Sequence, residues 1–309
     1  MKRRETKTVG DLFERFLDEK KLANMTKATL TNYLHYFSLY NQSQEISEKL
    51  ITEFSHEYLY NWHKTLDKVK PRTVKQYISS MRVFHLWLFE EGYLPTPPKH
   101  IYIKLDDTIP RYYTQEEIKS LISKPNDKAS FEEYSTYIMI CFLLATGVRA
   151  STLIEIKLSD LDFDNNLITL RHLKNRTKAI IPMSDKLHGI IYDYLHEFIR
   201  ESKDSYLFCD RNERQISTQG LRGRLTRYCK KRGVEFKDLH AFRHSYAHQY
   251  VHNGGSIEKL QKLLTHKSLQ TTAYYANIFG KDLQVGYEEI CPLDNLLSRH
   301  KVIHRSKSI

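Results

Sequence analysis

Apolar residues recur at helical spacing through the first hundred residues of the chain. The first helix is expected to begin after Thr8, a residue suited to capping, and its inner face holds Val9, Leu12, Phe13, Phe16 and Leu17. A second helix is expected over residues 26–40, with an inner stripe of Leu30, Tyr33, Leu34 and Phe37. Residues 46–67 predict two short helices. A fourth helix begins at Pro71 and runs to about Glu91, with inner residues Val74, Ile78, Met81, Val83, Phe84, Trp87 and Leu88.

The pattern then changes, because residues 92–100 are rich in proline and cannot continue a helix. We interpret residues 93–112 as a linker between two domains, a helical one over residues 1–92 and a second one over residues 113–309.

Beyond the linker the pattern predicts further helices and a small sheet. Thr114 and Glu117 suit a capping box, and residues 134–146 predict a buried helix that ends at Gly147. The segments 161–170 and 179–182 predict strands of an antiparallel sheet. Helices are expected over residues 184–201, 218–232, 238–253, 256–264 and 268–279. The predicted fold class is therefore mainly α with a small antiparallel β-sheet.

Composition adds a polyanionic partner to this picture. The 309 residues include 48 Lys+Arg and 37 Asp+Glu, a net charge of +11, and both predicted domains are basic. The longest apolar run, residues 138–145, is too short to cross a bilayer, and we expect no signal peptide, because no apolar stretch follows the basic first residues. The four cysteines are scattered without a CxxC pair, which fits a reducing compartment. We expect a cytoplasmic, nucleoid-associated protein with no membrane partner.

A phosphate-binding constellation lies in the second half of the chain. His240 and Arg243 are three residues apart and share one face of a helix, where Arg can clamp phosphate oxygens and His can move a proton. Arg149 follows the glycine break after the buried helix, and Lys174 lies in the turn of the sheet. Each of these features alone is weak evidence.

Taken in order, these segments resemble the motifs of the tyrosine recombinase (integrase) family, of the simple two-domain Xer-like type. Thr146-Gly147-Val148-Arg149 looks like the first arginine motif, His240 and Arg243 match an H-x-x-R box, and Leu264-Thr265-His266 resembles an L-G-H box. Tyr275 lies nine residues after His266, at the spacing of the family's nucleophile. Lys174 lies eight residues before Pro182, where the family has its strand-turn lysine.

The resemblance implies a helical core-binding domain, a catalytic domain and a metal-free cleavage of DNA. Tyr275 would attack the phosphate and form a 3′-phosphotyrosyl link, while Arg149 and Arg243 would hold the nonbridging oxygens. Lys174 would protonate the leaving 5′-oxygen, His240 would assist proton movement, and His266 would hydrogen-bond the phosphate. No cofactor, neither metal nor ATP, is expected, because the covalent link conserves the bond energy.

The sequence departs from the family pattern at several positions. The glycine of the L-G-H box is Thr265, and the acidic residue three after the first arginine is Thr152. Around Lys174 the family's flanking glycines are Leu173 and Asn175, its later arginine is Ala179, and Arg176 and Lys178 are nearby cations. Tyr274 adjoins Tyr275, so spacing alone selects the nucleophile.

Basic residues on helices of both predicted domains suit contacts with DNA phosphates, the alternative being solvated charged faces. In the first domain the candidates are Lys27, Lys70, Arg72, Lys75, Gln76 and Arg82. In the second domain they lie on residues 218–232 and are Arg222, Arg224, Arg227, Lys230 and Lys231, with Arg232 beside them and an inner face of Leu221, Leu225, Tyr228 and Cys229.

His240, His244, His248 and His252 recur every fourth residue, and a zinc site is the alternative reading of this ladder. No Glu of an H-E-x-x-H motif and no cysteine cluster accompanies them. We therefore expect no metal, with His244 as a buttress that orients the site and His248 and His252 as solvent or packing residues.

The resemblance further implies a C-shaped clamp on double-stranded DNA with inverted-repeat core sites. It also implies strand exchange through a Holliday junction by a homo-tetramer, with a related recombinase as a possible second subunit. Leu293, Leu296 and Leu297 in the tail would dock on a neighbouring protomer, unless residues 291–309 are simply a frayed terminus. With helices beginning near Thr8, no additional N-terminal DNA-binding domain is expected.

Several functions remain open from the sequence alone. Integration of a mobile element and Xer-like resolution of DNA multimers share these features. A type IB topoisomerase, a DNA-binding protein without catalysis and a histidine metalloenzyme are the rival classes. Relaxation of supercoiled DNA without joining would favour the first rival, and inhibition by EDTA would favour the last.

Overall fold

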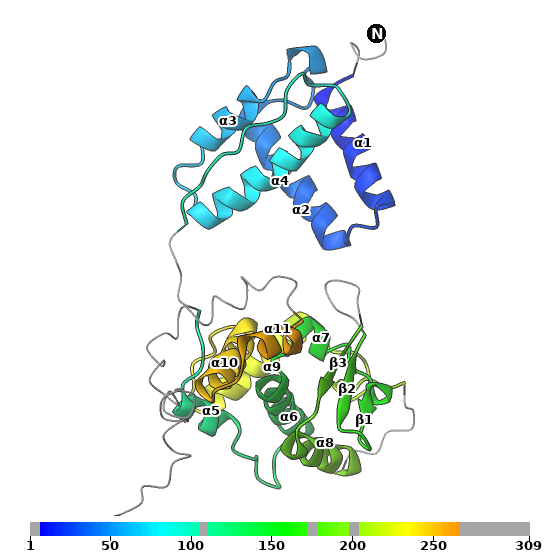
Figure 1. Cartoon of the computed structure of the whole chain (residues 1–309), viewed down its shortest axis with the longest axis vertical. Coiled ribbons are helices and arrows are strands. Elements are labelled where there is room, and N and C mark those ends of the chain that lie inside the picture. Colours follow the sequence, from blue (N-terminus) through cyan, green and yellow to red (C-terminus); the bar gives the residue numbers. More distant parts are fainter. Residues whose placement is uncertain (1–6, 106–109, 172–177, 198–203, 266–309) are drawn as a thin grey trace, which may run out of the picture. The chain divides into compact units, whose positions relative to one another are not determined.

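The computed structural model of the chain describes residues 7–105, 110–171, 178–197 and 204–265. Its contacts divide the chain into two compact units, residues 1–108 and 109–309 (Figure 1). The division falls inside the stretch predicted as a linker. Each unit has a hydrophobic core of its own.

The first unit is a helical bundle. Its elements are α1 (Val9–Leu22), α2 (Lys27–Gln44), the 3-10 helix η1 (Ile51–Glu53), α3 (Glu57–Lys64) and α4 (Pro71–Glu90). Aromatic rings fill the space between them: Phe13 stacks on Phe37 with centroids 3.8 Å apart, and Tyr40 stacks on Trp62 at 4.7 Å. This aromatic core joins α2 and α4 to the shorter helices around them.

The predicted helix starts of this unit are confirmed by their caps. The Thr8 hydroxyl accepts a hydrogen bond from Asp11 N at 3.1 Å, and Thr26 caps α2 in the same way. Two predicted core positions are wrong, because Leu34 is 53% exposed and Val83 is 38% exposed. The buried residues of α2 are instead Tyr36 and Tyr40, and at 3.6 residues per turn Leu34 points away from both of them.

The proline-rich stretch after α4 packs on the first unit for much of its length. Leu94 is buried, and Ile101 and Ile103 lie against the same core. The Arg82 guanidinium donates to the carbonyls of Pro98 and Lys99 at 3.2 and 3.3 Å. Proline excludes a helix here, but it does not prevent the extended chain from packing.

The second unit is mainly helical and carries a small antiparallel sheet. Its helices are α5 (Gln115–Leu121), α6 (Phe131–Thr146), α7 (Ala150–Leu153), α8 (Asp185–Glu197), α9 (Thr218–Lys231), α10 (Leu239–His252) and α11 (Ile257–Leu263), with the 3-10 helix η2 (Leu158–Asp160). The strands are β1 (Leu161–Asp162), β2 (Leu167–Leu170) and β3 (Ala179–Pro182). Thr114 and Glu117 form the predicted capping box of α5. The predicted fold class is confirmed.

The strands pair in the order β1-β2-β3, with Ile168 opposite Leu161 on one side and Ile181 on the other. Ile168 and Ile181 are buried and join the core of the unit. The register ends with Leu170 opposite Ala179. The connection that follows carries Lys174, which lies outside the described residues.

Helix α6 forms the centre of the second unit and packs on α8, α9 and α10 (Figure 1). It is buried along most of its length, in keeping with the apolar run over residues 138–145. Within the described ranges, no helix is both long and apolar enough to cross a membrane. The predicted helix 268–279 and the tail with Leu293, Leu296 and Leu297 lie outside the described residues.

Candidate active site

The end of α6 delivers Arg149 to the site. Gly147 ends the helix in the left-handed conformation, with φ +62°, and Arg149 then begins α7 as its N-cap residue. A Cβ atom on Gly147 would lie 2.3 Å from Tyr246 Cδ1 and 2.9 Å from Leu264 Cδ2. Glycine is therefore required both for the turn and for the close approach of α10 and α11.

Arg243 joins three segments of the second unit. Its side chain is buried, with 5% exposure, and extends from α10 toward the end of α6. Nη1 donates to the Gly147 carbonyl at 2.8 Å, and Nη2 donates to the Leu264 carbonyl at 2.7 Å. The guanidinium thus fixes the Arg149 turn and the end of α11 relative to each other.

Arg149 and Arg243 line one depression, together with Val148, Thr152, Leu170, Leu263, Leu264 and Thr265. Two of these positions come shortly before predicted catalytic residues in the chain. Leu170 ends β2, four residues before Lys174, and Thr265 precedes His266. Lys174, His266 and Tyr275 themselves lie outside the described residues, as does Tyr274. Sequence analysis did not assign Leu170 to the site, since only the sheet places it there.

His240 is exposed in the first turn of α10, whose N-terminus is capped by Asp238. The His240 and His244 rings are 6.4 Å apart, one turn from each other. Burial, together with the nearby His240 and Arg243, lowers the pKa of His244. A neutral ring at this position fits a supporting role beside Arg243.

The remaining histidines of the ladder pack against their surroundings. His248 stacks on Tyr112 with centroids 4.4 Å apart, and His252 stacks on His248 at 6.0 Å. The Ser245 hydroxyl accepts a hydrogen bond from Tyr113 N at 2.7 Å, so residues 112–113 run along α10. In the parts of the chain that the structure describes, no three His, Cys, Asp or Glu residues are grouped to hold a metal ion.

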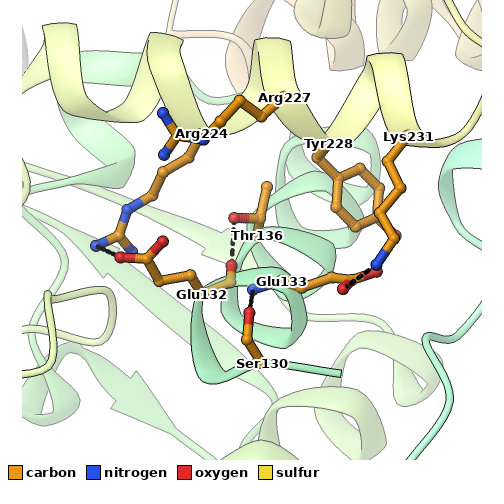
Figure 2. A pocket seen from close by; sticks show the side chains of 8 residues that line it. All are labelled: Ser130, Glu132, Glu133, Thr136, Arg224, Arg227, Tyr228 and Lys231. Carbon is orange, nitrogen blue, oxygen red and sulfur yellow. Dashed lines mark hydrogen bonds and ion pairs between the residues drawn. The ribbon is translucent and has the colours of Figure 1, made fainter. Parts of the chain in front are cut away.

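Among the candidate DNA contacts on α9, Arg224 alone is buried. Arg222, Arg227, Lys230 and Lys231 are exposed. Arg224 is 9% exposed, donates to the Cys209 carbonyl at 3.3 Å and lies 3.9 Å from Glu132. Lys231 pairs with Glu133 at 2.5 Å, and Figure 2 shows both ion pairs crossing the cleft between α9 and the start of α6.

The candidate DNA contacts of the first unit show a similar division. Lys27 at the start of α2 is exposed, as are Lys70, Arg72, Lys75 and Gln76 at the start of α4. Gln76 also donates to the Tyr36 hydroxyl at 2.7 Å. Arg82 is partly buried and bonds to the carbonyls of Pro98 and Lys99, as described above.

One ion pair near the depression has no counterpart among the sequence predictions. Arg171, directly after β2, bonds to the carboxylate of Asp160 at the end of η2. The two residues are eleven positions apart, and only the β1–β2 register brings them together. No motif in the sequence indicates this contact.

Comparison with protein families identifies the family of this chain. The model of the phage integrase family matches residues 111–281, which is more than half of the chain and contains the whole depression. The chain belongs to the phage integrase family. This recombinase is thus an enzyme of the tyrosine type, a class that breaks and rejoins DNA.

Its relatives extend the match beyond the catalytic part. The recombinase is 32% identical over 199 residues to tyrosine recombinase XerA of Pyrococcus furiosus, covering 63% of this chain and 66% of the relative. It is 26% identical over 287 residues to tyrosine recombinase XerC of Staphylococcus aureus, covering 89% and 94% of the two chains. Its fold matches the solved structure of the Tn1549 transposon integrase in complex with transposon right end DNA with a TM-score of 0.71, at 18% identity and 87% and 94% coverage.

Proposed function

We propose that this recombinase exchanges strands between DNA duplexes at specific sites through a 3′-phosphotyrosyl intermediate on Tyr275. The observation that carries the proposal is the depression shared by Arg149 and Arg243. The chain enters the segments of Lys174 and His266 from two residues that line it, Leu170 and Thr265. The described geometry therefore supports the assignment of Lys174 and His266 to the same site as Arg149 and Arg243.

The chemistry follows from the charges available at such a site. The phenol oxygen of Tyr275 attacks the phosphorus, its proton passes toward His240, and the P–O5′ bond breaks. Arg149 and Arg243 stabilise the charge on the nonbridging oxygens, and the Lys174 ammonium protonates the leaving 5′-oxygen. His266 adds a hydrogen bond to the phosphate. These groups supply charge and proton, so we expect neither metal nor ATP to be required.

The exposed cations of both units provide the DNA-binding surface in this proposal. On α9 these are Arg222, Arg227, Lys230 and Lys231, of which Lys231 also pairs with Glu133, and at the start of α4 they are Lys70, Arg72 and Lys75. Lys27 of α2 is a further candidate. Arg224 and Arg82, whose guanidinium groups bond within the protein, contribute mainly to holding α9 and the segment after α4 in place.

The partner is double-stranded DNA with inverted-repeat core sites, bound by a homo-tetramer. The Tn1549 integrase of similar fold is bound to transposon end DNA, which supports a duplex partner. The tail with Leu293, Leu296 and Leu297 would dock on a neighbouring protomer and close the assembly. Both integration of a mobile element and resolution of DNA multimers use this reaction.

Formation of a covalent adduct tests the proposal. The substrate is a nicked suicide duplex cut from the DNA that flanks the gene, incubated in EDTA and analysed on a denaturing gel. We expect wild type and Tyr274→Phe to form the adduct and Tyr275→Phe to form none, with DNA binding retained in a mobility shift. An adduct lost only in Tyr274→Phe, or binding by all variants without any adduct, contradicts the proposal.

A further inference from the structure

One exposed cation of α9 is paired with a carboxylate of α6. Lys231 Nζ lies 2.5 Å from Glu133 Oε2, across the cleft between the two helices (Figure 2). The Lys231 side chain is 64% exposed, whereas that of Glu133 is 16% exposed. Arg227, one turn earlier on α9, lines the same cleft. An anion in solution can therefore reach the cation of this pair while the carboxylate stays largely covered.

The Glu133 carboxylate has a favourable position without Lys231. Glu133 lies in the first turn of α6, and its backbone N–H donates to the hydroxyl of the N-cap residue Ser130 at 3.2 Å. A negative charge in the first turn is stabilised by the partial positive charge of the helix N-terminus. The Lys231 ammonium, in contrast, lies at the end of a flexible four-carbon stem. Of the two partners, Lys231 is therefore the one that can change its contact.

The second ion pair across the cleft behaves differently. Arg224 is 9% exposed, donates to the Cys209 carbonyl at 3.3 Å and lies 3.9 Å from Glu132. Two groups therefore hold the Arg224 guanidinium inside the unit, where a polyanion at the surface does not reach it. The neighbouring carboxylates Glu132 and Glu133 thus face one cation that is fixed and one that can be drawn away.

We propose that Glu133 competes with DNA phosphates for Lys231 and thereby weakens binding of the recombinase to DNA of any sequence. The proposal rests on the proposed function, in which exposed cations of α9 contact DNA. Lys231 must leave one anion to bind another, so its contact with phosphate adds little affinity while Glu133 is charged. Phosphate contacts carry no sequence information, so Glu133 acts on the sequence-independent part of binding.

The size of the effect follows from the release of counterions. Each phosphate neutralised by a cation changes the slope of log K against log salt concentration by about 0.9, which amounts to about fivefold in affinity at about 0.15 M salt. Glu133→Gln removes the competing charge and keeps the shape of the side chain. We therefore expect this variant to bind a random-sequence duplex about fivefold more tightly, with a slope steeper by about 0.9.

A double-mutant cycle tests the proposal. Binding of the full chain to a fluorescent random-sequence duplex is measured by anisotropy between about 0.05 and 0.2 M salt, the range in which such contacts change affinity strongly. The variants are Glu133→Gln, Lys231→Gln and the double variant, with thermal unfolding measured for each. Because an exposed ion pair adds little stability, we expect all of them to fold. Glu132→Gln is the matched control, since it removes the same charge one residue away while Arg224 stays buried.

We expect the gain from Glu133→Gln to disappear in the Lys231→Gln background, so that the double variant binds like Lys231→Gln. We expect Glu132→Gln to leave the salt slope unchanged. An affinity that Glu133→Gln does not raise overturns the proposal. A gain that persists without Lys231, or that Glu132→Gln reproduces with the same change in slope, also overturns it, because net charge alone then explains the result.

The failure of this inference differs from the failure of the proposed function. Wild-type protein is also tested for adduct formation on the nicked suicide duplex. If the adduct forms and the cycle shows no coupling between Glu133 and Lys231, the competition is wrong and the recombinase reaction stands. If wild type neither binds the duplex nor forms an adduct, the proposed function is contradicted and the inference with it.

Discussion

His85 on α4 is a buried neutral base, and its protonation is expected to unfold the first unit at low pH. The ring is fully buried, with Nε2 3.1 Å from the Tyr40 hydroxyl and Nδ1 3.0 Å from His56 Nδ1. His56 Nε2 lies 2.6 Å from the Thr96 carbonyl, which can only accept. His56 therefore donates to Thr96, His85 donates to His56, and the Tyr40 hydroxyl donates to His85.

Burial, and to a smaller extent the neighbouring His56 ring, lowers the pKa of His85 from 6.5 to about 3. The unfolded chain binds a proton at His85 below pH 6.5, while the folded chain does not do so until about pH 3. Stability is therefore present above pH 6.5 and is lost as the pH falls. The full shift corresponds to about 5 kcal/mol, of which about 2 kcal/mol is lost between pH 7 and pH 5.

Tryptophan fluorescence isolates this effect. The chain has two tryptophans, Trp62 and Trp87, and both lie in the core of the first unit. Urea unfolding of wild type and His85→Gln at pH 7 and pH 5 gives the change in the free energy of unfolding for each. We expect wild type to lose about 2 kcal/mol more than the variant over this range, and His35→Gln, an exposed substitution on α2, to behave like wild type. Equal losses in wild type and His85→Gln would refute the reasoning.

Three further predictions concern the second unit. Thr265, which follows the C-cap residue of α11, has a φ of +52°. Thr265→Gly should relieve this backbone strain and raise the free energy of unfolding by about 1 kcal/mol, which corresponds to a rise in Tm of about 2–4 °C. An unchanged or lower Tm contradicts this. Gly147→Ala should lower the Tm far more than Gly233→Ala, because both have positive φ but only Gly147 lacks space for a Cβ atom; equal losses would show that backbone strain alone matters. Arg224→Gln should lower the free energy of unfolding in urea by about 1–3 kcal/mol, because the Arg224 side chain is buried and paired with Glu132. Arg227→Gln should leave stability unchanged but weaken DNA binding, and the slope of log K for DNA binding against log salt concentration should become smaller by about 1. The opposite pair of results would contradict these assignments.

Helices were predictable where local chemistry decides them. Thr8, Thr26 and Thr114 each cap the helix expected after them, and Gly147 ends α6 as its sequence indicates. Periodicity was less reliable at the edges of a helix face. Leu34 fits an apolar stripe by spacing, but α2 packs through Tyr36 and Tyr40, which point away from Leu34.

Contacts between distant residues were not predictable from the sequence. Arg243 bonds to the carbonyl of Gly147, 96 residues away, and carbonyl groups carry no sequence signal. The basic helix α9 shows the same limit. Its composition indicates a polyanion-binding face, yet only the packed structure shows that Arg224 points toward Glu132 rather than into solvent.

The departure at Thr265 has a physical reading that the sequence alone could not supply. The family places glycine at this position, and the structure shows a left-handed backbone there, a conformation that glycine adopts without strain. In this recombinase a β-branched residue adopts that backbone, which makes the position strained.

The identity of the DNA-linked residue tests the central claim most directly. Wild-type protein is reacted with the nicked suicide duplex in EDTA, the adduct is digested with nuclease and protease, and the peptide that carries the nucleotide remnant is sequenced by tandem mass spectrometry. The account predicts a phosphodiester remnant on Tyr275, at full yield without divalent metal. A remnant on Tyr274 or on a serine, or an adduct that forms only when metal is restored, would contradict it.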